Sequence, residues 1–248
     1  MRGQYISSRQ NSRIQQLRRL LRSRKERESA GLFVADGVKL LSEAVRWWPG
    51  LETVVLSEGV EAELPEQVEL LRVPREIMEY VSPMETPQGA LFVCRLPEKA
   101  EYEARPGLVL DGIQDPGNLG TILRTADALQ VPVVLLEGCA DPYSHKVVRA
   151  SMGAVFRTPV VQSTWEAVKS ACQKANIPVA VTALSERAED IRNAQLSQMA
   201  VVIGSEGQGV RREILEQAQK QLIIPMNPNC ESLNAAVAAT ICMWQMKL

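Results

Sequence analysis

The sequence predicts an α/β protein with two domains, the second of which contains a parallel β-sheet. Short apolar runs alternate with segments of helical spacing along most of the 248 residues. In the second half these apolar runs are continuous, which is typical of strands buried on both faces of a parallel sheet. A polar, proline-flanked stretch between the halves has the composition of a linker. We therefore expect domains at residues 1–96 and 107–248, joined by a linker at 97–106.

The chain begins with a strongly basic amphipathic segment. Residues 1–27 contain nine basic residues and one acidic residue, a net charge of +8, although the whole chain carries −1. A solvated helix packed on the domain needs fewer charges than this, and arginine binds phosphate oxygens with two parallel hydrogen bonds. The segment therefore favours nucleic-acid binding over a merely solvated surface. The helix has an apolar stripe at Ile14, Leu17, Leu20 and Leu21, and the candidate nucleic-acid-binding residues are Arg9, Arg13, Arg18 and Arg22.

The remaining elements of the first half alternate, which predicts a small three-layer domain. We expect strands at 32–36, 53–57, 68–73 and 89–95, and helices at 39–48 and 75–81. The second half repeats strand and helix more regularly. We expect strands at 108–113, 131–136, 179–183, 199–203 and 222–225, a partly extended stretch at 155–161, and helices at 119–129, 144–150, 165–175, 211–218 and 233–246.

Ligands bind beyond the carboxyl ends of the strands in open parallel sheets, and three loops there stand out. Residues 111–124 form a glycine-rich turn in which Asn118 is a candidate helix cap and Arg124 a candidate for a surface salt bridge. Residues 203–210 have the spacing G-x-x-G-x-G, which is neither the dinucleotide fingerprint nor a P-loop. Residues 223–237 contain Ser232, a candidate N-cap, and Asn234, whose position the apolar pattern of the helix does not explain.

Several classes of protein are excluded by composition. The five cysteines form no CxxC pair, and His145 is the only histidine, so we expect neither a metal site nor a multi-histidine active site. Apolar runs are far shorter than the roughly 20 residues that span a bilayer, and the first residues lack a signal peptide. We therefore expect a soluble cytoplasmic protein without membrane association.

The three loops resemble the signature motifs of the SpoU/TrmH family, within the SPOUT superfamily of RNA methyltransferases. The matching segments are Asn118-Leu-Gly-Thr-Ile-Leu-Arg124, Val202-Ile-Gly-Ser-Glu-Gly-Gln-Gly209, Ile224-Pro-Met226 and Glu231-Ser-Leu-Asn-Ala-Ala-Val237. The resemblance covers residues 107–248, and the first half resembles, less specifically, the family's L30e-like RNA-binding domain.

The resemblance implies transfer of a methyl group from S-adenosyl-L-methionine to a ribose 2′-hydroxyl, with ribosomal RNA favoured over transfer RNA. It also implies a deep trefoil knot from about Gln221 onward, one of the rare exceptions to the rule against threaded chains, and a homodimer packed through the C-terminal domain. The implied catalytic residues are Arg124, Asn118, Glu206, Ser232 and Asn234. The implied cofactor-binding residues are Ala183, Leu184, Gly204, Ser205, Ile224, Met226 and Leu233.

Physical chemistry limits what Arg124 can do in such a reaction. Arginine is hard to deprotonate in proteins, so we favour an electrostatic role over a general base, which would need strong local perturbation. Glu206 would then orient Arg124, and Asn234 or Ser232 would position the ribose. The alternatives are a tRNA 2′-O-methyltransferase, a non-catalytic RNA-binding module of the same fold, and a nucleotide-dependent oxidoreductase, against which the glycine spacing argues.

Overall fold

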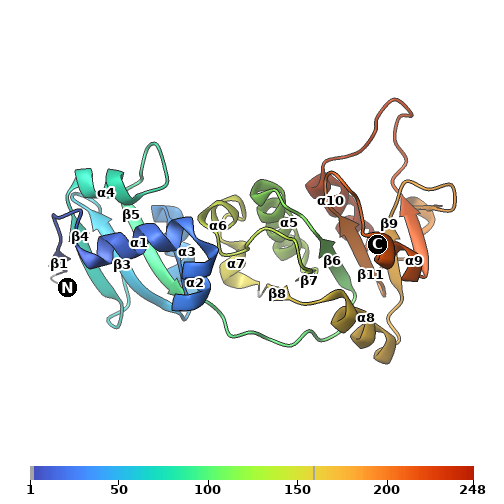
Figure 1. Ribbon diagram of the computed structural model, residues 1–248, viewed down its shortest axis with the longest axis horizontal. Helices are drawn as coiled ribbons and strands as arrows, with labels where there is room; N and C mark the ends of the chain where they lie inside the picture. The colour runs from blue at the N-terminus through green and yellow to red at the C-terminus, as the bar shows by residue number, and fades with distance from the viewer. Residues whose placement is uncertain (1–2, 159) are drawn as a thin grey trace. The chain divides into compact units, whose positions relative to one another are not determined.

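The computed structural model describes residues 3–158 and 160–248, which belong to two compact units (Figure 1). The first unit contains the chain up to Glu98 together with Asp141–Arg157. The second unit contains Lys99–Ala140 and the chain from Thr158 to Leu248. The sequence assigned residues 141–157 to the second domain, whereas their side chains pack in the first unit.

The first unit contains a mixed five-stranded sheet in the order β1-β4-β3-β5-β2. Strands β1, β4 and β3 are parallel, and β5 runs antiparallel to both β3 and β2. The two-residue strand β1 was not expected from the sequence. The strands are β1 (Gln4–Tyr5), β2 (Leu32–Asp36), β3 (Leu51–Ser57), β4 (Glu69–Val73) and β5 (Ala90–Arg95).

Helices cover both faces of this sheet, as the expected three-layer arrangement requires. Successive strand residues point to opposite faces. Val34 and Val93 join the cluster formed by α1 and α4, while Phe33 and Phe92 pack against Phe156 on the other face, with ring centroids 6.3 and 6.1 Å away. The helices are α1 (Ser12–Arg22), α2 (Arg24–Ala30), α3 (Val38–Trp47), α4 (Arg75–Val81), α6 (His145–Ala150) and α7 (Ala154–Arg157).

The expectation of a partly extended stretch at 155–161 is correct only at its end. Ala154–Arg157 is the short helix α7, and only Val161–Gln162 form a strand, while Pro159 lies outside the described residues. Phe156 is 4% exposed within the aromatic cluster of the first unit. A short apolar run does not distinguish a strand from a buried helical turn, so tertiary packing decides its conformation.

The second unit contains a seven-stranded sheet in the order β10-β12-β9-β11-β6-β7-β8. All six neighbouring pairs are parallel, which confirms the expected parallel sheet. The strands are β6 (Gly107–Asp111), β7 (Val133–Leu135), β8 (Val161–Gln162), β9 (Val179–Thr182), β10 (Glu189–Asp190), β11 (Ala200–Gly204) and β12 (Lys220–Ile223).

Helices pack on both faces of the parallel sheet as well. Trp165 of α8 and Ile214 of α9 join one buried cluster with the central strands. Helix α10 instead packs on α5 and on strands β6 and β11. The helical elements are α5 (Pro116–Leu129), α8 (Trp165–Lys174), a 3₁₀ turn (Ile191–Asn193), α9 (Arg212–Gln217) and α10 (Ala235–Gln245). None of the helices in the described residues is long and apolar enough to cross a membrane.

A buried ion pair attaches residues 141–157 to the rest of the first unit. Arg27 is 5% exposed, and its Nε and Nη2 donate to Asp141 Oδ2 at 2.8 and 2.5 Å. Its Nη1 also donates to the carbonyl of Leu20 at 2.6 Å. His145 lies in the same segment, and burial lowers the pKa of its imidazole. This histidine is the first residue of α6 in the attached segment.

Asp141→Asn should therefore destabilise the protein, because it leaves the buried Arg27 guanidinium without a counter-charge. We expect a loss of about 3 kcal/mol in the free energy of unfolding, measured by urea denaturation. The exposed pair Arg75–Glu79 provides the control, and Glu79→Gln should cost less than about 0.5 kcal/mol. Equal losses in the two variants would contradict a special role for the buried pair.

Candidate functional site

Three loops of the second unit leave the sheet at the same edge. They follow the carboxyl ends of the parallel strands β6, β11 and β12. The register pairs Gly204, the last residue of β11, with Asp111, the last residue of β6. Strand β9 lies between β11 and β12 and is paired with both. The parallel arrangement thus brings together segments that are about a hundred residues apart in sequence.

A chain of side-chain hydrogen bonds connects these loops. Asn234 Nδ2 donates to Asn118 Oδ1 at 2.8 Å, and Asn118 Nδ2 donates to Glu206 Oε1 at 2.8 Å. The partners are 116 and 88 residues apart in sequence. Because a carboxylate only accepts hydrogen bonds, Glu206 fixes the orientation of the Asn118 amide, which in turn accepts from Asn234. The structure therefore brings together three of the five residues that the resemblance implied as catalytic.

Helix capping explains why two asparagines are available at this point. Asp115, not Asn118, caps α5, because its Oδ1 accepts from the backbone N–H of Asn118 at 2.7 Å. The Asn118 side chain is therefore free to contact other loops. At α10 the cap is Asn234, whose Oδ1 accepts from the N–H groups of Ala236 and Val237 at 2.9 and 3.3 Å.

The expectation that Ser232 caps α10 is thus wrong, because the helix begins at Ala235 and only Asn234 precedes it directly. Ser232 is exposed in the same loop, and its carbonyl accepts a hydrogen bond from the Cys230 thiol. Its hydroxyl has no partner among the residues that the structure describes. Ser232 therefore presents a polar group to solvent two residues before Asn234.

The loop after β11 is closed at its neck by backbone pairing. Ser205 and Gly209 exchange hydrogen bonds of 3.1 and 3.0 Å through their backbone groups. A Cβ on Gly204 would lie 2.0 Å from the Gly209 carbonyl carbon, so only glycine fits there. The open end of the loop differs, because a Cβ on Gly207 would meet nothing within 4 Å. The loop thus has a rigid base and an accessible tip that carries Glu206.

Asp111 holds the exit of this loop. Its side chain is 2% exposed and accepts from the Arg211 backbone N–H at 2.8 Å and from Arg211 Nε at 2.7 Å. A carboxylate that binds both the backbone and the side chain of one residue fixes the local chain direction. Sequence reasoning missed this pair, although an aspartate at the end of an apolar buried strand is a signal that could have found it.

The residues that the resemblance implied for cofactor binding follow three neighbouring strands, β9, β11 and β12. Leu184, just after β9, is 68% exposed despite its apolar side chain. The Ala183 N–H donates to the Leu222 carbonyl at 2.9 Å, which continues the sheet by one residue. The full set comprises Ala183, Leu184, Gly204, Ser205, Ile224, Met226 and Leu233, all of which are exposed or half-buried. This sheet edge therefore presents apolar side chains and loop backbone together.

Arg124 lies on α5 and is exposed. Within the described residues it has neither a hydrogen bond nor an ion pair. Glu206 accepts a hydrogen bond from Asn118. The expected pairing of Glu206 with Arg124 is not found among the described residues. In this structure Glu206 therefore orients an amide, and the Arg124 guanidinium keeps its full set of donors.

The four candidate RNA-binding arginines lie in the first unit and have different surroundings. Arg13 Nη2 bonds Glu69 Oε1 at 3.1 Å. Arg9 and Arg18 lie over the ring of Tyr80 of α4, whereas Arg22 is exposed at the end of α1. Sequence reasoning missed Tyr80, because the contact joins two helices far apart in the chain.

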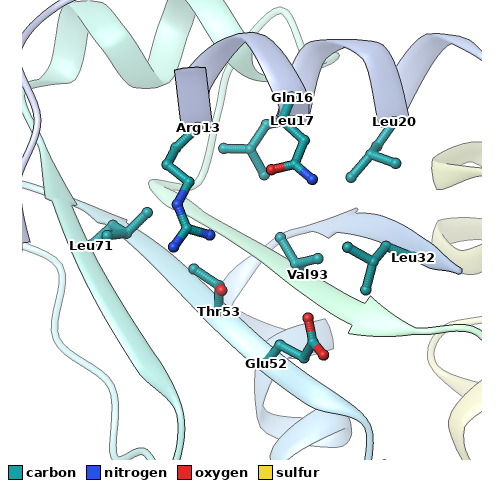
Figure 2. Close-up of a pocket in the computed structure, with 9 residues that line it drawn as sticks. All are labelled: Arg13, Gln16, Leu17, Leu20, Leu32, Glu52, Thr53, Leu71 and Val93. Atoms are coloured by element: carbon teal, nitrogen blue, oxygen red, sulfur yellow. The ribbon is translucent and has the colours of Figure 1, made fainter. Parts of the chain in front are cut away.

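A small cavity of the first unit lies between α1 and the sheet. Figure 2 shows Arg13 extending from α1 toward Thr53 of β3. The other lining residues are Gln16, Leu17, Leu20, Leu32, Glu52, Leu71 and Val93. The cavity contains none of the residues that the motifs predict as catalytic. Among the described residues, no three His, Cys, Asp or Glu side chains are grouped closely enough to hold a metal ion.

In comparison with known proteins, each half of the chain matches the model of a known family. Residues 106–244 match the SpoU rRNA Methylase family, and residues 11–91 match the MRM3-like substrate binding domain. The chain is 32% identical, over 98% of both proteins, to the 23S rRNA (guanosine(2553)-2′-O)-methyltransferase RlmP of Bacillus subtilis.

Two solved structures are similar over nearly the whole chain. The AdoMet-bound rRNA methyltransferase from Sinorhizobium meliloti has a TM-score of 0.85 at 25% identity and covers 99% of this chain and 97% of its own. The SpoU methyltransferase AviRb from Streptomyces viridochromogenes, in complex with AdoMet, has a TM-score of 0.84 at 26% identity, with 96% and 97% covered.

The two functions of Asn234 can be separated by substitution. Asn234→Ala removes the cap of α10 and should lower the free energy of unfolding by about 1 kcal/mol. Asn234→Ser keeps a capping oxygen and adds no charge beside Asn118 Oδ1, so its stability should stay within about 0.5 kcal/mol of the unchanged protein. Urea denaturation measures both. Equal destabilisation by the two substitutions would show that the bond to Asn118, rather than the cap, dominates.

Proposed function

Because this chain belongs to the SpoU rRNA methylase family, we propose that it transfers a methyl group from S-adenosyl-L-methionine to a ribose 2′-hydroxyl of ribosomal RNA. The observation that carries this proposal is the hydrogen-bonded chain Asn234–Asn118–Glu206, which joins the three motif loops at one sheet edge. The Bacillus subtilis relative acts, by its name, on 23S rRNA and matches over 98% of both chains. We therefore infer that 23S rRNA is the substrate.

The sheet edge beyond β9, β11 and β12 fits the cofactor in its chemistry. S-adenosyl-L-methionine combines a flat aromatic base with polar groups, and ligand sites of this kind combine apolar side chains with a few backbone donors and acceptors. Leu184, Ile224 and Met226 supply the apolar side chains, and the loop that begins at Gly204 and Ser205 supplies open backbone at its tip, where a Cβ on Gly207 would meet nothing within 4 Å. When bound, the cofactor supplies an activated methyl group on a positively charged sulfur.

The chain's own residues would position the ribose and stabilise charge. Arginine keeps its proton in proteins, so the Arg124 guanidinium would hold an RNA phosphate and stabilise the negative charge that develops on the 2′-oxygen. The Ser232 hydroxyl, which is exposed near Asn234, would hydrogen-bond the ribose. Glu206 would hold Asn118 and thereby keep the loops in place around the reacting atoms.

The order of the strands supports a trefoil knot in the second unit. Strand β12 lies between β9 and β10, although both precede it in the chain. After β12 the chain continues through residues 224–234 to α10, which packs on α5, β6 and β11. In the strand order, β9 separates β12 from β11 and β6, so the chain crosses β9 between β12 and α10. We infer that the last strand and helix thread through an earlier loop, and that this threading forms the cofactor site beyond β9, β11 and β12.

An uncovered apolar stripe on α10 supports a homodimer. Val237 and Trp244 are 48% and 59% exposed, and the half-buried Ile241 lies between them at helical spacing. The opposite face of α10 is buried by Ala235, Ala236, Ala239, Cys242 and Met243. A self-complementary surface of this kind suits a two-fold symmetric pair. We propose that two copies pack through α10.

The first unit would bind RNA. Its match to a substrate-binding domain and its basic first helix support this role, and we propose that its fold is of the L30e-like type. Its mixed sheet, covered by helices on both faces, is consistent with that type. We also place the protein in the cytoplasm, where the proposed bacterial rRNA substrate is found.

Arg124→Ala should lower the rate of methyl transfer about a hundredfold or more, because the guanidinium acts on RNA and on the developing charge. Cofactor binding should survive in this variant. Transfer of labelled methyl groups to 23S rRNA and calorimetric titration with S-adenosyl-L-methionine measure the two effects. Arg212→Ala, which removes an exposed arginine paired with Glu216, is the control. Mapping 2′-O-methylation in a deletion strain, complemented with either form, identifies the nucleotide. Undiminished turnover in Arg124→Ala would reject the role assigned to it.

Trp244→Glu should convert the proposed dimer into monomers, because it places a charge in the apolar stripe of α10. Sedimentation equilibrium measures the change in mass. Trp47→Glu in the first unit substitutes another exposed tryptophan, 46% exposed, and should leave the mass unchanged. A wild-type protein that sediments as a monomer would refute the dimer.

A further inference from the structure

Tyr80 lies at the centre of an arginine cluster on the surface of the first unit. The Cζ atoms of Arg18 and Arg9 lie 4.0 and 4.9 Å from the centroid of its ring. Arg18 belongs to α1, Tyr80 belongs to α4, and Arg9 precedes α1, so three segments meet here. Cation–π contact holds the guanidinium groups against the ring and restricts long side chains that would otherwise be mobile.

The hydroxyl of Tyr80 has its acceptor positions filled. Arg18 Nη1 donates to it, and Gln15 Nε2 donates to it at 3.4 Å. Gln15 Nε2 also donates to the Arg9 carbonyl at 2.6 Å, which ties the start of the basic segment to α1. A tyrosine hydroxyl has two acceptor lone pairs and one donor proton. With both lone pairs engaged, the hydroxyl proton is left to bind an external acceptor.

Arg9 and Arg18 also differ from other arginines of the basic segment in their charge balance. Four of those others pair with a carboxylate: Arg13 with Glu69, Arg19 with Glu26, Arg24 with Glu28 and Arg27 with Asp141. Within the described part of the chain, Arg9 and Arg18 have no acidic partner. On the neighbouring helix α4, Glu79 is engaged by Arg75 at 2.8 Å.

The local field at Tyr80 is accordingly positive. The hydrogen bond from Gln15 is the largest cause that lowers the pKa of its hydroxyl, and the charges of Arg18 and Arg9 lower it further. A group that donates a hydrogen bond beside two cations suits an anion with several oxygens. A phosphodiester of RNA has this chemistry, and nucleic-acid affinity depends largely on such contacts.

We propose that Arg9, Arg18 and Tyr80 form one binding site for a backbone phosphate of the RNA substrate, in which both guanidinium groups and the tyrosine hydroxyl donate to its oxygens. The inference rests on the proposed function and adds which residues of the basic segment contact RNA. The ring of Tyr80 holds the guanidinium groups in place. Arg13, which is already neutralised by Glu69, contributes less than Arg9 or Arg18.

Binding of the full-length protein to a labelled 23S rRNA transcript, measured at several potassium chloride concentrations, tests the site. Arg9→Gln and Arg18→Gln should each weaken binding about three- to tenfold and reduce the slope of log affinity against log salt by about 0.7. Tyr80→Phe keeps the ring and the net charge, so it should weaken binding about two- to fivefold and leave the slope unchanged. Arg24→Gln is the matched control, because it removes the same charge from an exposed pair and should bind as the wild type does.

Several outcomes overturn the inference. If Arg9→Gln and Arg18→Gln bind the transcript as Arg24→Gln does, the cluster is not a binding site. If Tyr80→Phe has unchanged affinity, the hydroxyl does not contact the phosphate. Circular dichroism and urea denaturation of each variant identify loss of fold, and titration with S-adenosyl-L-methionine should be unchanged in all of them. Methylation of the same transcript by the wild type is measured in parallel. Its absence, with the order of affinities intact, would refute the proposed function and leave the phosphate site standing.

Discussion

The hydrogen-bonded chain from Asn234 through Asn118 to Glu206 depends on a single constraint, which is that β6, β11 and β12 all end at the same edge of a parallel sheet. In parallel sheets the carboxyl ends of all strands lie together, so residues from distant parts of the sequence meet there. The register of Gly204 against Asp111 then sets the height at which two of the loops begin. A shift of one residue would reverse the side-chain faces of a whole strand and separate the loops.

In each unit a charge pair with a buried partner fixes a segment of the chain. In the second unit, Asp111 binds Arg211 so that a charge pair fixes the direction of a loop. In the first unit, Arg27 and Asp141 do the same for residues 141–157, which the family match assigns to the methylase region. The chain passes between the units at residues 98–99, 140–141 and 157–158. A segment of the methylase region is therefore part of the fold of the proposed RNA-binding unit.

Sequence patterns predicted what is local or periodic and missed what depends on distant partners. The parallel sheet and its three loops follow from continuous apolar runs and glycine spacing, which each segment carries by itself. The cap of α10 was assigned to Ser232 because a serine and an asparagine are equally good caps, and only the position where the helix begins distinguishes them. The helix at 154–157 depends on packing of Phe156 against Phe33 and Phe92, and the role of Tyr80 depends on arginines more than sixty residues away.

The surroundings of Arg124 and Arg211 show why one of these arginines suits the proposed reaction. Arg211 is held by the buried Asp111 and contacts Glu213, so its charge is balanced within the chain. Arg124 is exposed, and Glu206, the carboxylate expected to pair with it, binds the neutral amide of Asn118 instead. A carboxylate paired with Arg124 would cancel the charge that an RNA phosphate and a developing alkoxide require. The amide of Asn118 therefore allows Glu206 to order the loops without neutralising the Arg124 guanidinium.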